Sequence, residues 1–115
     1  MTTQTRQEII INNLRVKPQS FGEVEAEIVT GAVEPAPIKR QLIEATLEQQ
    51  GANLIPIIIR HLPEPDEDEN EYEAIYGGEW VQIAKEMGVN RLHAWIMDVS
   101  DDQIPEIQET MRMLA

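Results

Sequence analysis

One segment, from Leu92 to Val99, constrains the fold more than any other because apolar residues occupy both sets of alternating positions. Leu92, Ala94 and Ile96 fall on one side of the pattern, and Trp95, Met97 and Val99 fall on the other, together with His93. Successive side chains of a strand point to opposite faces of its sheet. A strand that is apolar on both faces is typical of the interior of a sheet. We therefore expect this segment to lie centrally.

Apolar periodicity and turn residues divide the rest of the chain into further strands and helices. Strands are predicted at 8–16, 23–28, 57–60 and 72–76, and helices at 37–50, 80–87 and 104–114. Lys17–Gly22 supplies Pro, Ser and Gly for a turn, so residues 8–30 predict an N-terminal hairpin. The fold class is therefore α+β, with a small mixed sheet of about four to five strands packed with three helices.

Each predicted helix has an apolar face and a recognisable end. The faces are Ile38, Leu42, Ala45, Ile43 and Leu47 in the first helix, Trp80, Ile83, Ala84 and Met87 in the second, and Ile104, Ile107, Met111 and Leu114 in the third. Gly51 and Gly88 suit helix C-termini, and Ser100–Gln103 matches a capping box. The third face runs to the last residue without a terminating glycine, as expected if the natural protein continues past Ala115.

Length and composition limit the class of protein. With 115 residues, the chain is expected to form a single domain. It has no apolar run of membrane-spanning length and no secretory signal pattern, so we expect a cytoplasmic protein. The formal net charge of −12 and the lack of a basic run oppose nucleic-acid binding by this domain alone. The acidic segment 63–71 is predicted to be a mobile loop.

Four short motifs resemble the ParB N-terminal domain, also called the ParB-like nuclease domain, of the ParB/sulfiredoxin superfamily. Leu54–Arg60 is similar to that family's G-L-I-x-P-I-x-V-R strand, Tyr72–Gly77 to its Y-E-I-x-x-G, Ala84–Val89 to its A-K-x-x-G-L, and Ala94–Asp98 to its P-A-x-V-x-D strand. The resemblance covers about two thirds of the chain, from Ile38 to Gln103. It implies a ParB/sulfiredoxin-like fold, with the N-terminal hairpin outside the match.

The turn at 77–79 departs from the chemistry of both branches of this superfamily. The ParB turn reads G-E-R-R-x-R-A-A-K, and its arginines hold nucleotide phosphates, whereas Gly77–Lys85 retains the first glycine and the Ala-Lys end without an arginine. In sulfiredoxins the turn reads G-G-C-H-R, and Glu79 stands where its nucleophilic cysteine would be. Because the chain has no cysteine, sulfiredoxin catalysis is excluded.

The candidate ligand-binding residues are Gly77, Gly78, Glu79 and Trp80. The glycines could cradle an anion, but they also suit a tight strand-to-helix turn. Glu79 is a weak candidate for a catalytic base, although acidic residues are common in the first turn of a helix. We expect Trp80 to belong to the core. No metal site and no cofactor are predicted, and neither His61 nor His93 has a partner at metal-ligand spacing.

Three functions remain open. The first is a non-catalytic ParB-like module in a DNA-maintenance, partition or regulatory setting, which acts through protein contacts or tethers a nucleic-acid-binding segment absent from this chain. The second is a metal-dependent nuclease or nucleotide hydrolase using Glu73, Glu79 and the acidic loop. The third is an anion or small-ligand sensor at Gly77–Gly78. A protein partner or a homodimer is expected, with the Ile104, Ile107, Met111 and Leu114 face as the alternative contact to self-packing.

Overall fold

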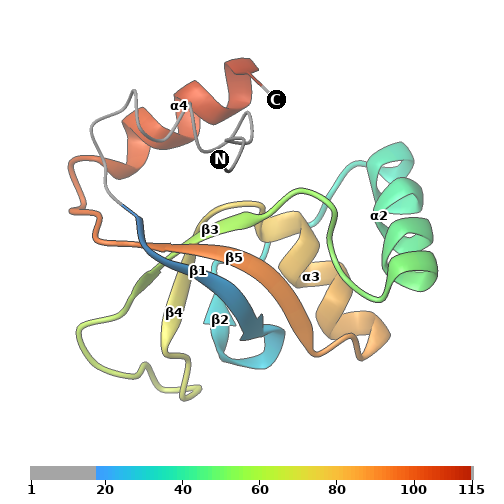
Figure 1. Ribbon diagram of the computed structural model, residues 1–115, viewed down its shortest axis with the longest axis horizontal. Helices are drawn as coiled ribbons and strands as arrows, with labels where there is room; N and C mark the ends of the chain where they lie inside the picture. The colour runs from blue at the N-terminus through green and yellow to red at the C-terminus, as the bar shows by residue number, and fades with distance from the viewer. Residues whose placement is uncertain (1–17, 115) are drawn as a thin grey trace, which may run out of the picture.

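Five strands form one mixed sheet (Figure 1). The structure, a computed structural model, describes residues 18–114. The strands are β1 (Pro18–Glu25), β2 (Val29–Thr30), β3 (Ile57–His61), β4 (Tyr72–Tyr76) and β5 (Arg91–Met97), in the sheet order β1-β5-β3-β4-β2. β5 is antiparallel to β1 and parallel to β3, β3 is antiparallel to β4, and β4 is parallel to β2. The predicted central position of β5 is confirmed.

Helices cover both faces of the sheet. Helices α2 (Pro37–Gln50) and α3 (Gly78–Met87) pack on one face, and α4 (Ile104–Leu114) packs on the other (Figure 1). The three consecutive isoleucines of β3 pack on both faces of the sheet. Ile57 and Ile59 join the apolar cluster under α2 and α3, and Ile58 joins the cluster under α4. The α+β class with three helices and a mixed five-stranded sheet is therefore confirmed.

The predicted turn of the N-terminal hairpin is wrong. Residues 18–22 belong to β1, which pairs with β5 from Pro18 opposite Met97 to Glu25 opposite Arg91. The predicted second strand also ends early, because Ala26–Ile28 forms a 3-10 turn, η1. Backbone pairing with a distant strand outweighs the local turn preference of Pro, Ser and Gly. The predicted strand at 8–16 lies outside the described residues.

The predicted faces of α2 and α3 are only partly buried. Both helices end at the predicted glycines, Gly51 and Gly88. In α2, however, only Ile43 and Leu47 are buried, and the rest of the expected face (Ile38, Leu42 and Ala45) is exposed. In α3 the buried side chains include Val81, and Met87 is exposed. One neighbouring layer covers only part of the circumference of a helix. Part of each broad apolar face is therefore exposed to water.

The face of α4 packs within the chain. Ile107 and Met111 are buried against the sheet, and Ile104 is partly buried there. These three residues follow the self-packing alternative, whereas Leu114, the fourth residue of the expected face, is 40% exposed. The capping box forms in part: the Ser100 N–H donates to Gln103 Oε1 at 3.0 Å, but the Ser100 hydroxyl also donates to Gln103 Oε1. Within residues 18–114, no helix is long and apolar enough to cross a membrane.

The acidic loop between β3 and β4 has internal hydrogen bonds. Asp66 Oδ1 accepts hydrogen bonds from the backbone N–H groups of Asp68 and Asn70, and Asp66 Oδ2 accepts one from Asn70 Nδ2 at 2.9 Å. Asn70 is buried. These bonds from Asn70 and Asp68 hold the pKa of Asp66 below its ordinary value of 3.8. The mobility of the loop stays a prediction.

Candidate functional site

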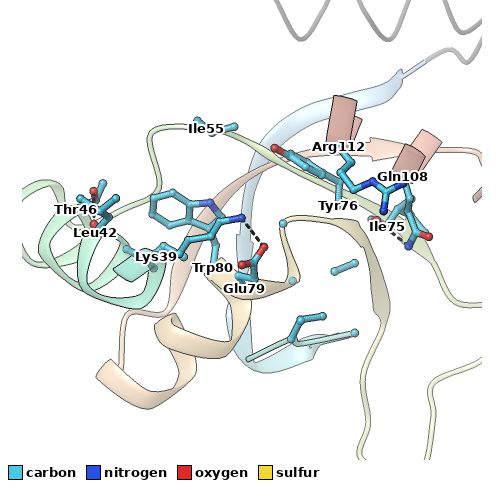
Figure 2. Close-up of a pocket in the computed structure, with 16 residues that line it drawn as sticks. Lys39, Leu42, Thr46, Ile55, Ile75, Tyr76, Glu79, Trp80, Gln108 and Arg112 are labelled. Carbon is cyan, nitrogen blue, oxygen red and sulfur yellow. Dashed lines mark hydrogen bonds and ion pairs between the residues drawn. The ribbon is translucent and has the colours of Figure 1, made fainter. Parts of the chain in front are cut away.

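A pocket of about 750 Å³ lies over the turn that joins β4 to α3 (Figure 2). All four candidate residues, Gly77, Gly78, Glu79 and Trp80, line it. The remaining walls come from the loop before α2, from α2 itself, from Ile55, from the end of β4, and from the side of α4. The structure thus brings the predicted residues to one concave surface, with a volume in the range of small-molecule sites.

Close backbone packing explains the two glycines of the turn. Gly77 has φ +87°, and a Cβ placed on it would lie 2.6 Å from Ile57 Cγ2. A Cβ on Gly78 would overlap the carbonyl oxygen of Gly31, and the Val33 N–H donates to the Gly78 carbonyl at 3.1 Å. Glycine is therefore needed here to join β4, α3 and the loop before α2, whether or not a ligand binds.

Glu79 is neutralised by a lysine from another helix. Its Oε1 lies 2.8 Å from Lys39 Nζ of α2, and its side chain is 25% exposed (Figure 2). The carboxylate also stands in the first turn of α3, where the helix dipole favours a negative charge. This arrangement fits a contact that fastens α2 to α3, and a carboxylate so paired is poorly placed to serve as a free base.

Trp80 is both a residue of the core and a residue of the pocket wall. It packs against the cluster under α2 and α3, and it also lines the pocket, where Figure 2 shows its indole pointing toward α2. The side chain is partly buried, so the expectation of a core tryptophan holds only in part. The indole is at once an anchor for the turn and one wall of the pocket.

Other pocket residues were missed because they come from elements far away in the sequence. Leu42 and Lys39 extend from α2, Ile55 from the loop before β3, and Arg112 from the last turn of α4. Arg112 donates to Glu109, and this bond raises the pKa of the guanidinium. No motif marks these residues, since only the packing of α2 and α4 on opposite faces of the sheet brings them to the pocket.

The carboxylates needed for a metal-dependent enzyme are kept apart. Glu73 Oε1 accepts a hydrogen bond from Arg60 at 2.8 Å, and Arg60 also lies 2.7 Å from Asp101. The acidic loop precedes β4, whereas Glu79 follows it, so the two lie beyond opposite ends of that strand. Within the part of the chain that the structure describes, no three His, Cys, Asp or Glu side chains are placed to hold a metal ion together.

Neither histidine belongs to the pocket. The ring of His61 lies 4.7 Å from the ring of Tyr72, and the ring of His93 stacks on Phe21 at 6.5 Å, measured between centroids. His93 and Phe21 lie on the strands β5 and β1, and the pocket is lined by other residues. The expectation that neither histidine forms a ligand cluster remains a prediction.

Comparisons with known proteins identify the fold. No protein-family model and no curated protein sequence matches the chain. Among solved structures, it is similar to the C-terminally truncated chromosome-partitioning protein ParB from Caulobacter crescentus complexed with CTP-gamma-S, with a TM-score of 0.68 and 17% identity over 84% of this chain and 54% of that one. The same ParB complexed to the centromeric parS site matches with a TM-score of 0.51 and 18% identity, over 76% of this chain and 44% of that one.

This chain spans about half the length of those ParB chains. At such identities the likeness shows the fold alone. The four motifs at Leu54–Arg60, Tyr72–Gly77, Ala84–Val89 and Ala94–Asp98 fall on or beside β3, β4, α3 and β5, the elements that build the centre of the sheet and the turn. The chain has a ParB-like fold.

Proposed function

We propose that this chain is a non-catalytic ParB-like module that acts through protein contacts in a DNA-maintenance, partition or regulatory setting. One observation carries the proposal: exposed apolar side chains gather around the pocket. Val33 (54% exposed), Leu42 (65%) and Ile55 (45%) line it; Ile38 (76%) lies one turn of α2 before Leu42, and Leu54 (68%) precedes Ile55. A concentration of exposed apolar groups on a small domain is typical of a surface that a partner covers.

The chemistry of the turn supports a binding role over a catalytic one. Gly77–Lys85 has no arginine to hold phosphates, and the chain has no cysteine. The strongest candidate base, Glu79, is paired with Lys39. The setting comes from the ParB-like fold, because the similar structures are those of a chromosome-partitioning protein.

Site-specific photo-cross-linking in the cell that makes the protein tests this function. A benzophenone amino acid would replace Leu42 or Ile55 at the pocket and, as a control, the exposed Phe21 of β1, which lies outside the pocket. We expect discrete protein adducts from positions 42 and 55 and none from position 21. If all three positions give no adduct, or the same diffuse adducts, the protein-contact function is wrong.

A second candidate, a sensor of small anionic ligands, is favoured by the pocket itself. Lys39 and Arg112 bring cationic groups to it from α2 and α4, and Trp80 and Tyr76 provide aromatic walls. Both cations are already paired, with Glu79 and Glu109, so an anion must displace a carboxylate to bind them. We therefore expect CTP, ATP and Mg²⁺ at millimolar concentration to leave the thermal midpoint unchanged. A saturable rise would favour the sensor over the protein-contact module.

A further inference from the structure

Strands β1 and β5 carry a group of aromatic side chains on the face of the sheet where α4 packs. Trp95 of β5 packs against the cluster under α4, and its register partner Phe21 lies on the same face. The centroids of these two rings are 4.7 Å apart, and the ring of His93 stacks on Phe21 at 6.5 Å. We call Phe21, His93 and Trp95 the aromatic patch. Helix α4 packs chiefly against β4, and Phe21 on the edge strand β1 is 52% exposed.

The patch contains a buried polar atom that has capacity for one more hydrogen bond. Trp95 Nε1 is buried, and it donates to no acceptor among the residues that the structure describes. Buried indole N–H groups usually have an acceptor. Both the exposed ring of Phe21 and the N–H of Trp95 are therefore suited to a further segment that packs on this part of the sheet.

We propose that residues 8–16 of the same chain pack on the aromatic patch. This inference goes beyond the proposed function, since the patch shares no residue with the pocket. The segment contains five large apolar side chains that can cover the rings, namely Ile9, Ile10, Ile11, Leu14 and Val16. A backbone carbonyl of the segment accepts the hydrogen bond that Trp95 Nε1 donates.

The segment is joined to the edge of the patch. Strand β1 begins at Pro18, the register partner of Met97, and Met97 lies two residues from Trp95 on the same face of β5. Nine residues in extended form span about 30 Å, which exceeds the roughly 10 Å between Pro18 and Phe21 along the strand. A short tether of this kind gives an effective concentration on the order of millimolar. The patch is therefore more accessible to residues 8–16 than to a free partner.

Charge favours the same occupant. The first 17 residues of the chain contain three basic residues and one acidic residue, whereas the remainder contains six basic and twenty acidic residues. On the patch side of the sheet, the described strands also carry more carboxylates than guanidinium groups: Glu23, Glu25 and Glu73 against Arg60 and Arg91. The N-terminal segment brings Arg15 and Lys17 to this negative face.

A second copy of the chain fits the patch less well. It brings a formal net charge of −12 to a face that is itself negative. Helix α4 stands above the neighbouring part of the same face (Figure 1). A helix with its side chains is roughly 10 to 12 Å across, so it obstructs a flat contact with another domain. A single tethered segment can lie beside α4 without this obstruction.

Photo-cross-linking in the purified 115-residue chain tests the contact. A benzophenone amino acid replaces Phe21 and, as a control, the exposed Leu42 of α2 on the other side of the sheet. We expect irradiation to join position 21 to the tryptic peptide 7–15 within one chain, and position 42 to give no such product. A cross-link within one chain leaves no adduct with another protein, as already expected for position 21.

A second measurement follows the indole N–H of Trp95 by NMR, with the two tryptophan signals assigned through Trp80→Phe. The triple variant Ile9→Ser, Ile10→Ser and Ile11→Ser should exchange this proton with solvent faster than the parent chain, and it should lose the cross-link from position 21. The control variant Thr2→Ser, Thr3→Ser and Thr5→Ser changes polar residues of the same terminus. It should match the parent chain in both measurements.

Three results would overturn the proposal. The first is irradiation that gives no product between position 21 and peptide 7–15. The second is a triple variant that keeps both the cross-link and the exchange rate of the parent chain. The third is a product of twice the chain's mass, which would make the occupant a second copy. None of these results depends on partner adducts at positions 42 and 55, so the proposed function is tested separately.

Discussion

Trp80 packs against the core and also lines the pocket. The loss of stability when it is replaced therefore measures how much its indole contributes to packing. A fully buried large aromatic costs roughly 3 to 5 kcal/mol when truncated to Ala. Because Trp80 is only partly buried and lines the pocket, we expect Trp80→Ala to cost about 1 to 3 kcal/mol, below that range. Glu79→Ala removes an ion pair whose lysine is exposed and whose carboxylate is partly exposed, and it should cost about 1 kcal/mol or less. Urea unfolding of both variants provides the values; a Trp80→Ala midpoint equal to that of the parent would show that the indole contributes nothing to packing.

Substitution of Gly78 tests whether the close packing of the turn excludes a single added methyl group. Gly78→Ala would drive a methyl group into the carbonyl oxygen of Gly31, and a backbone atom cannot move aside as a flexible side chain can. We expect a loss of about 1 to 3 kcal/mol in the free energy of unfolding, the usual cost of overpacking. Gly22→Ala is the matched control, because a Cβ there meets nothing within 4 Å. It should change stability by less than about 1 kcal/mol, in the stabilising direction. Similar losses in both variants would reject this account of the turn.

At the scale of elements, α4 stabilises the domain by covering the second face of the sheet. Ile107→Ala deletes a buried side chain in contact with that layer, and we expect it to cost about 2 to 5 kcal/mol. Met113→Ala, on the exposed side of the same helix, should cost less than about 0.5 kcal/mol. Both free energies come from urea unfolding at several protein concentrations. If the midpoint of the parent chain rises with concentration, α4 is stabilised by association and the assignment of its face to the chain's own sheet fails.

The loop between β3 and β4 links stability to pH through Asp66. Its folded-state pKa lies below the ordinary 3.8, chiefly because Asn70 donates hydrogen bonds to the carboxylate. A carboxylate with a lowered pKa stabilises the fold at pH values above 3.8, and the contribution is lost as the pH falls through the folded-state value. The melting midpoint of Asp66→Asn should therefore lie below that of the parent near neutral pH, and the difference should shrink as the solution becomes more acidic than the ordinary carboxyl pKa. The neighbouring Asp68→Asn serves as the control; a difference that stays constant with pH would contradict this role of Asp66.

At the scale of the whole molecule, the charge distribution opposes binding to nucleic acid. Six Lys and Arg residues lie within 18–114, of which Lys39, Arg40, Arg60, Arg91 and Arg112 are each paired with a carboxylate, and Lys85 Nζ donates to the Val29 carbonyl at 2.8 Å. Phosphate binding would have to break these contacts against a formal net charge of −12. We expect no mobility shift of duplex DNA with micromolar protein at about 150 mM salt. A shift retained at that salt concentration would contradict this expectation.

Elements whose signals are local were predictable from the amino-acid sequence. Gly51 and Gly88 end their helices as predicted, the three isoleucines of β3 form a strand, and Leu92 to Met97 forms a central one, because helix termination and side-chain alternation depend on residues a few positions apart. The four candidate residues, Gly77–Trp80, form a continuous segment between a strand and a helix, so their proximity was predictable, whereas their ligand-binding role stays a prediction.

Which surfaces are covered, and what surrounds the turn, depends on contacts between distant parts of the chain. Pairing with β5 made residues 18–22 a strand, although their composition favours a turn. Burial of Ile43 and Leu47 left Ile38 and Leu42 in water, because one layer covers only one arc of a helix. The Lys39–Glu79 pair joins residues 40 positions apart, and Arg112 approaches the pocket from α4. Long-range contacts of this kind depend on how the helices pack against the sheet, which no local pattern encodes.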